Sequence, residues 1–234
     1  MSLPLFLVGS LPAAPGAFRL DGPEGHHAAD VQRITAGERL LLGDGRGGIA
    51  TAVVTAARKG VLELDVEGVE QVPAPAPAIT VVQGIAKGER GELAVQLMTE
   101  LGVDRIVPWQ AARSIARWKD AKPLERWRST VREAAKQSRR PWLPEVTEPV
   151  RQLRLEGAVL VLHEEAAVPL SAVELPSSTD ITLVVGPEGG IAPEELDTLS
   201  AAGARPVRLG REVLRTSSAG AAAIAALSVR LGRW

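Results

Sequence analysis

Two stretches in the last third of the sequence each join a short apolar run to a turn that contains glycine. The first is Gly186-Pro187-Glu188-Gly189-Gly190, which follows the apolar run 181–185, and the second is the run 207–216. Such loops expose backbone N–H and C=O groups that can bind a ligand. Each loop precedes a helical pattern, at 193–199 and at 217–231. Strand, loop and helix in succession predict a parallel α/β sheet with a site at its strand ends.

The first loop has three interpretations. As a phosphate cradle it lacks the Gly-Lys-Ser/Thr ending that contacts β- and γ-phosphates and magnesium. As a plain strand-to-helix turn it exposes more backbone than a turn requires. Because the second loop also follows a strand at an equivalent position, we favour a third interpretation, in which the two loops form two walls of one pocket.

The composition is that of an ordinary folded protein, with 45% hydrophobic and 24% charged residues. No cysteine and three histidines occur, so we expect neither disulfides nor a metal centre. No apolar run approaches the roughly 18 residues that span a bilayer. The apolar start at 3–8 is short and contains Pro4, so no signal peptide is expected. These features predict a cytoplasmic protein.

The formal net charge of −1 conceals a strong segregation of charge along the chain. Residues 105–154 carry 13 Lys and Arg against 5 Asp and Glu, whereas residues 155–204 carry 9 acidic residues and no Lys or Arg. Residues 205–234 are again basic. Such asymmetry concerns partners rather than fold, and it indicates a polyanion bound by one face.

Four of the five tryptophans lie in 109–142, interleaved with arginine and lysine. A helix after Pro123 would bury Leu124, Trp127, Val131 and Ala134, and would leave a solvated ridge. That ridge would consist of Arg128, Arg132, Lys136 and Arg139. A basic solvent-exposed face over core tryptophans is one interpretation. We favour RNA binding, because cations and aromatic rings together match the phosphate-plus-stacking pattern.

The sequence divides into two predicted domains. Residues 1–72 are predicted to form a small β domain. Gly43, Gly45 and Gly48 in it match the Gly-x-Gly-x-x-Gly motif of dinucleotide-binding folds, but a strand and not a helix follows, so we interpret this segment as a hairpin turn. A short helix is expected at 30–35. Residues 73–78 form a Pro/Ala linker. Residues 79–234 form the α/β domain, with strands at 79–85, 103–108, 159–165, 181–185 and 207–209. A helix at 91–101 is expected to bury Leu93, Leu97 and Leu101, with Ala94 and Met98.

The two loops carry a family resemblance. Val185-Gly-Pro-Glu-Gly-Gly190, followed by Leu209-Gly-Arg-x-Val-Leu-Arg-Thr216, resembles the 16S rRNA uridine-N3 methyltransferase family of the SPOUT class. Segments 87–90, 100–103, 133–140 and 27–33 also resemble the family, so the likeness runs through the whole chain. It implies a PUA-like β-barrel followed by a parallel-sheet α/β domain with a deep trefoil knot. It also implies a homodimer, S-adenosylmethionine as cofactor, and 16S rRNA of the small ribosomal subunit as partner, with no membrane and no metal.

The cofactor-binding residues follow from the same likeness, whereas most of the RNA-binding residues come from the basic segment described above. The expected cofactor-binding residues are Leu162, His163, Gly186, Pro187, Glu188, Gly189, Gly190, Ile191, Leu209, Gly210, Val213, Leu214 and Thr216. The expected RNA-binding residues are Arg33, Lys87, Arg90, Arg113, Arg117, Arg128, Arg132, Lys136, Arg139 and Arg140. Taken alone, His163 is an ordinary residue at a strand end.

Methylation of uridine N3 requires loss of a weakly acidic proton on the Watson–Crick edge, so the base must be unpaired or extruded. Arg215 is the candidate for stabilising the uracil anion, with a structural or phosphate-binding role equally open. Glu133 is the candidate base, although glutamates on helices are mostly solvated. The chain also departs from the family at Lys136, often glutamate, at Arg139, often glycine, and at Leu97, often lysine. Ser217 replaces a usual glutamate, which puts in doubt a catalytic carboxylate there.

Two alternatives remain open. A knotted methyltransferase could act on another RNA atom, such as a ribose 2′-OH. A non-catalytic RNA-binding ribosome-assembly factor would not bind S-adenosylmethionine at all.

Overall fold

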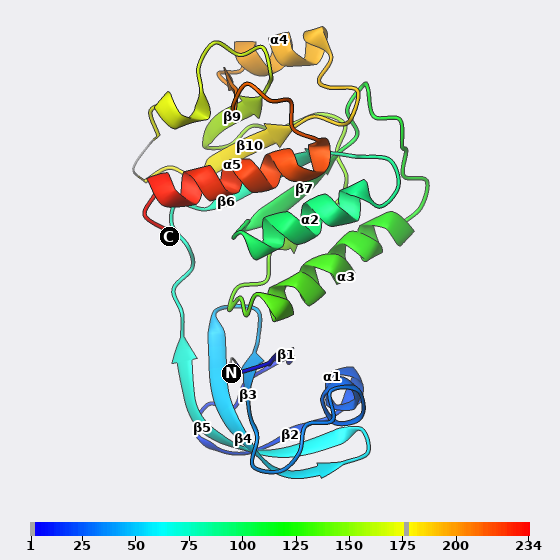
Figure 1. Ribbon diagram of the computed structural model, residues 1–234, viewed down its shortest axis with the longest axis vertical. Helices are drawn as coiled ribbons and strands as arrows, with labels where there is room; N and C mark the ends of the chain where they lie inside the picture. The colour runs from blue at the N-terminus through cyan, green and yellow to red at the C-terminus, as the bar shows by residue number, and fades with distance from the viewer. Residues whose placement is uncertain (1–2, 176–177) are drawn as a thin grey trace. The chain divides into compact units, whose positions relative to one another are not determined.

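The computed structural model describes residues 3–175 and 178–234 (Figure 1). Its contacts divide the chain into two compact units. The first contains residues up to 74 together with 135–143, and the second contains 75–134 and 144–234. Each unit is described by itself below.

The first unit is built on a β-sheet in which the described strands follow the order β1 (Leu5–Leu7), β3 (Arg39–Gly43), β4 (Gly48–Arg58), β5 (Val61–Gln71) and β2 (Gly16–Leu20). Only β1 and β3 among these pair in parallel. Alternate residues point inward, so Leu40 and Leu42 on β3 join Leu62 and Leu64 on β5 in one core around Phe6.

The sequence predicted the three central strands of this sheet, and the turn at 43–48 joins β3 to β4 as a hairpin. It did not predict β1 and β2, which are short and lack a long alternating pattern. The expected helix at 30–35 is wrong. Helix α1 (Gly22–His26) and a π-helical turn (His27–Val31) begin earlier in the chain instead, and only residues 30 and 31 of the predicted helix are helical. Glycine at position 25 allows helix α1 to pack this close to its neighbours, because a Cβ there would lie 2.6 Å from the carbonyl oxygens of Leu20 and Gly60.

The second unit contains a parallel sheet. Its described strands follow the order β11 (Arg205–Val207), β9 (Ala158–Leu162), β10 (Ile181–Val185), β6 (Ile79–Gly84), β7 (Arg105–Trp109) and β8 (Glu145–Val146). Four α-helices accompany these strands in the described residues: α2 (Arg90–Glu100), α3 (Lys122–Gln137), α4 (Pro193–Ala201) and α5 (Thr216–Arg230). A short 3-10 turn spans Leu170–Ala172. The α/β prediction is confirmed, and the strand β8 was missed because it has only two residues.

Helices cover both faces of the parallel sheet. Helices α2 and α5 pack against each other over one face (Figure 1). On the other face, Leu196 and Leu199 of α4 pack in a cluster with Val161 of β9 and Val184 of β10. Because all strands run in the same direction, the loops that leave β6, β9 and β10 emerge at one edge of the sheet.

The expected leucine stripe on α2 is wrong in part. Leu93 is 45% exposed, and Leu97 and Leu101 are only half-buried. Ala94 and Met98 are buried as predicted, and Gly91 and Val95 complete the buried face. Small residues fit better at this face because the neighbouring helices come close. A Cβ at Gly91 would lie 2.9 Å from the ring of Trp127.

On α3, the expected inward residues Leu124, Trp127, Val131 and Ala134 are all buried, as predicted. Trp109 and Trp127 are each 2% exposed, and Trp127 meets Trp118 edge to face at 5.0 Å between ring centroids. Trp109 and Trp127 are therefore core residues and do not offer a stacking surface to RNA.

Candidate functional site

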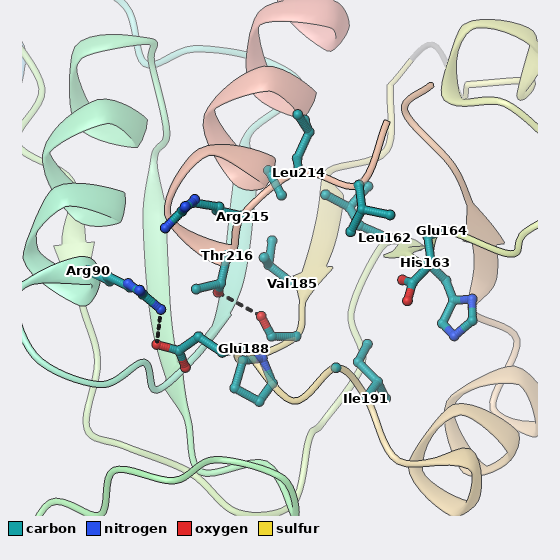
Figure 2. Close-up of a pocket in the computed structure, with 15 residues that line it drawn as sticks. Arg90, Leu162, His163, Glu164, Val185, Glu188, Ile191, Leu214, Arg215 and Thr216 are labelled. Atoms are coloured by element: carbon teal, nitrogen blue, oxygen red, sulfur yellow. Dashed lines mark hydrogen bonds and ion pairs between the residues drawn. The ribbon is translucent and has the colours of Figure 1, made fainter. Parts of the chain in front are cut away.

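A pocket of about 380 Å³ opens at the carboxyl edge of the parallel sheet, beside the ends of β9 and β10 and the start of α5 (Figure 2). Its volume lies in the ordinary range of roughly 300–1,000 Å³ for small-molecule sites. The described residues that line it are Arg90, Leu162, His163, Glu164, Val185, Gly186, Pro187, Glu188, Gly190, Ile191, Val213, Leu214, Arg215, Thr216 and Ala219.

The first loop passes so close to neighbouring atoms that it requires glycine at two positions. A Cβ at Gly186 would lie 2.9 Å from Cγ1 of Ile191, and one at Gly84 would lie 2.5 Å from the backbone nitrogen of Pro187. Gly190 has a φ of 73°, which favours glycine, and its N–H donates to the Pro187 carbonyl at 2.9 Å. The tight loop therefore keeps backbone atoms at the pocket wall.

A buried chain of hydrogen bonds joins this loop to α5. Gln83 at the end of β6 donates from Nε2 to Oγ1 of Thr216 at 2.9 Å, and Thr216 donates from Oγ1 to the Gly186 carbonyl at 2.7 Å. Gln83 and Thr216 are both buried. The sequence analysis missed Gln83, because nothing in a β-strand pattern distinguishes a buried glutamine that has partners.

The loop also contacts the segments that follow β6 and β7. Oε1 of Glu188 accepts a hydrogen bond from the Lys87 backbone N–H at 2.9 Å and lies 3.5 Å from Nη1 of Arg90. On the other side, Arg113 donates from Nη1 to the Gly189 carbonyl at 3.3 Å. Helix α4 starts with a partial capping box, in which Glu195 accepts from the Ala192 backbone N–H at 3.1 Å.

The second loop forms the opposite part of the pocket. The His163 backbone N–H donates to the Val207 carbonyl at 2.9 Å, which holds the end of β9 beside the start of this loop. Val213 is 74% exposed and Leu214 is 40% exposed, although both line the pocket. Figure 2 shows Leu162 and His163 on the far side of the pocket from Arg90, Glu188 and Arg215.

Most of the expected cofactor residues meet at this pocket. Ten line it: Leu162, His163, Gly186, Pro187, Glu188, Gly190, Ile191, Val213, Leu214 and Thr216. Leu209 and Gly210 line a cavity of about 70 Å³ that shares several of these residues. Gly189 is exposed and is absent from the described lining. The predicted set of cofactor-binding residues did not include Glu164, Val185 and Ala219. Arg90 was predicted only as an RNA-binding residue.

The two candidate catalytic residues do not lie together. Arg215 is exposed and lines the pocket, whereas Glu133 is exposed on α3 and is absent from the described pocket lining. Glu164 and Glu188 are the carboxylates in that described lining.

The expected RNA-binding residues differ in exposure and in partners. Arg33, Lys87, Arg90, Arg113, Arg117, Arg128 and Arg139 are exposed, and Arg132 and Arg140 are half-buried. Arg128 bonds Glu125 at 2.8 Å and Glu148 at 3.0 Å. These two carboxylates, Glu125 first, raise the pKa of Arg128 above its ordinary value and partly neutralise its charge.

The prediction that Lys136 lies on a solvated ridge is wrong. Its side chain is 7% exposed, and Nζ lies 3.2 Å from Oε2 of Glu24 within the first unit. The pair accounts for a lysine where the family often has glutamate, since a buried cation needs a partner. Arg139 has a φ of 52°, the region that favours glycine, which is the residue the family often has there.

Within residues 3–175 and 178–234, no group of three or more His, Asp or Glu side chains is arranged to hold a metal ion. Among the helices that the structure describes, none has the length and apolar character to cross a membrane.

Fold and pocket together define the class: a parallel α/β domain that binds a small molecule through backbone-rich loops at its carboxyl edge, with a separate small β unit. The chain belongs to the RNA methyltransferase family, whose domain model matches residues 73–228. A model described as the RNA methyltransferase PUA domain matches residues 20–67.

Curated relatives and solved structures agree with this family. A ribosomal RNA small subunit methyltransferase E of Mycobacterium tuberculosis is 48% identical and covers 98% of this chain and 93% of its own. The Neisseria gonorrhoeae protein of that name, crystallised with bound S-adenosyl methionine, has a TM-score of 0.89 at 30% identity over 98% of both chains. A proposed methyltransferase from Legionella pneumophila with bound SAM has a TM-score of 0.85 at 29% identity over 98% of both chains.

Proposed function

We propose that this protein transfers a methyl group from S-adenosylmethionine to N3 of a uridine in 16S rRNA of the small ribosomal subunit. The observation that supports this most directly is the pocket between the two loops, in a domain of the RNA methyltransferase family. The names of the relatives support the ribosomal substrate and the cofactor. Because ribosomal RNA is the proposed substrate, we also propose that the protein works in the cytoplasm.

The pocket suits S-adenosylmethionine. Leu162, Val185, Ile191 and Leu214 supply apolar surface for an adenine ring, and the glycine-rich backbone supplies hydrogen-bonding groups beside it. Cβ atoms at Gly84 and Gly186 would displace that backbone. When bound, the cofactor supplies an electrophilic methyl group on a sulfonium centre.

The protein must then hold an extruded uracil beside that methyl group and stabilise the charge left when N3 loses its proton. Arg215 lines the same pocket, so its guanidinium is placed to stabilise negative charge on the uracil. Glu133 as base remains a separate proposal, and it requires the helix that carries it to reach a target held at the pocket.

We propose that the exposed cations after β6 and β7, which include Lys87, Arg113 and Arg117, bind RNA phosphates close to this edge of the sheet. The first unit would add Arg33 and Arg139. We further propose that residues 1–72 act as the PUA-like RNA-binding domain, with a linker at 73–78 and the methyltransferase domain at 79–234.

We also propose that the protein is a homodimer through its α/β domain, which carries the trefoil knot implied by the family resemblance. Exposed apolar side chains at the end of this domain support a covered surface, since Val229 is 64% and Trp234 is 62% exposed. Sedimentation velocity measures the mass directly, and a monomer at micromolar concentration contradicts this proposal.

Calorimetric titration with S-adenosylmethionine, followed by methyl-transfer assays on unmodified small-subunit particles, tests the function. We expect one cofactor site per chain and a methyl group on uridine N3, located by mass spectrometry of the digested RNA. A methyl group on a ribose 2′-OH would correct the acceptor atom. A protein that binds RNA but not the cofactor would be a non-catalytic assembly factor.

A further inference from the structure

Glu188 links the proposed cofactor loop to a segment that carries two proposed RNA-binding residues. One carboxylate oxygen, Oε1, receives the Lys87 backbone N–H at 2.9 Å and faces Nη1 of Arg90 at 3.5 Å. The Glu188 side chain is 19% exposed, whereas that of Arg90 is 50% exposed. Figure 2 shows the Arg90–Glu188 pair beside Arg215 on one side of the pocket.

The burial of the second carboxylate oxygen bears on whether Glu188 can act as a base. Oε2 is buried and has no hydrogen-bond partner among the described residues. An oxygen that solvent does not reach is not open to a substrate in the pocket, so this carboxylate is poorly placed to accept a proton from uracil. Its contacts point to the Lys87–Arg90 segment instead.

We propose that Glu188 is a positioning residue that acts through Arg90. It fixes the backbone at Lys87 and orients the Arg90 guanidinium at the pocket rim, where Arg90 contacts a phosphate next to the extruded nucleotide. A half-exposed arginine samples many rotamers, and an oriented one loses less freedom when it binds a phosphate through its planar fork. This inference rests on the proposed function and adds a role that differs from contact with the cofactor.

A double-mutant cycle on small-subunit particles tests the role. Glu188→Gln keeps an oxygen that can accept the Lys87 N–H but removes the charge that orients Arg90. We expect kcat/KM for the particles to fall about tenfold in Glu188→Gln, while the Kd for S-adenosylmethionine stays within about twofold. Arg90→Ala should cause a similar or larger loss, and the double variant should be no slower than Arg90→Ala alone.

Glu89→Gln is the matched control, because it removes the same charge from an exposed neighbour on the same segment. It should leave kcat/KM and the cofactor Kd unchanged. Thermal unfolding of every variant separates loss of fold from loss of position. If Glu188→Gln unfolds near the wild-type temperature but is slow only when Arg90 is present, the coupling is supported.

Three results overturn the inference. The first is a loss of kcat/KM in the double variant equal to the product of the losses in the two single variants. The second is a Glu188→Gln variant that loses only affinity for the cofactor, and the third is a Glu188→Gln variant with wild-type kcat/KM. A wild-type protein that binds no S-adenosylmethionine would refute the proposed function itself, and this inference with it.

Discussion

Thr216 is the residue at which the two loops of the pocket meet. Its hydroxyl group accepts from Gln83 at 2.9 Å and donates to the Gly186 carbonyl at 2.7 Å, and the side chain is buried. One hydroxyl group therefore joins the end of β6, the first loop and the start of α5. The sequence indicated Thr216 as a ligand contact, whereas its bonds show that it also holds the wall together.

Thr216→Val keeps the shape of the side chain and removes both hydrogen bonds. Two buried polar groups would lose a partner, and each such loss costs about 1–3 kcal/mol. We expect a lower free energy of unfolding in urea and weaker binding of S-adenosylmethionine by calorimetry. Thr198→Val is the control, because its Oγ1 donates to the Glu194 carbonyl on an exposed part of α4. Equal stability of the two variants would contradict this account.

Arg215 lines the pocket without being buried, as expected of a group that meets the acceptor rather than the cofactor. Arg215→Ala should therefore lower kcat by about 10²–10³, in the range reported for loss of one charge-stabilising donor, and leave the cofactor Kd nearly unchanged. Single-turnover methyl transfer with saturating cofactor measures the effect. A variant as fast as wild type would exclude this role.

At the scale of elements, the site depends on how closely β6 approaches the first loop. A Cβ at Gly84 would lie 2.5 Å from the Pro187 nitrogen and 2.8 Å from the Gly186 carbonyl carbon, both backbone atoms. Backbone atoms in a tight loop cannot yield as a flexible side chain can. The last residue of β6 thus sets the position of a loop about a hundred positions later in the chain.

Gly84→Ala should push the first loop away from β6. The expected cost is about 1–3 kcal/mol in unfolding free energy, together with a clear loss of cofactor affinity. Gly68→Ala on β5 is the control, since a Cβ there would meet no atom within 4 Å. Urea unfolding and calorimetry compare the two, and equal cofactor affinity in both variants would show that the approach of β6 is unimportant.

At the scale of the whole molecule, the segregation of charge divides the second unit. The loops after β6 and β7 carry exposed Lys87, Arg113 and Arg117, whereas the acidic run 155–204 contains β9, β10 and α4. A polyanion attracted by the first group is repelled by the second, so charge orients RNA as well as attracting it.

Arg117→Ala should lower RNA affinity in a salt-dependent manner. If Arg117 contacts a phosphate, the slope of log K against log salt should fall by about 0.7–0.9. Fluorescence anisotropy with a 16S rRNA fragment from 50 to 200 mM salt measures this. Arg105→Ala removes an exposed cation at the start of β7, on the opposite edge of the sheet from the pocket, and should leave the slope unchanged. The same slope in wild type and Arg117→Ala would exclude a phosphate contact.

The sequence by itself determined the α/β class, the central strands and the two loops, because those features depend on local patterns such as apolar runs that end in glycine. Only the tertiary structure decided which face of α2 is buried, that Lys136 pairs with Glu24, that Glu133 lies outside the described pocket lining, and that Gln83 and Arg90 belong to the site. Each of these depends on atoms brought together from distant parts of the chain.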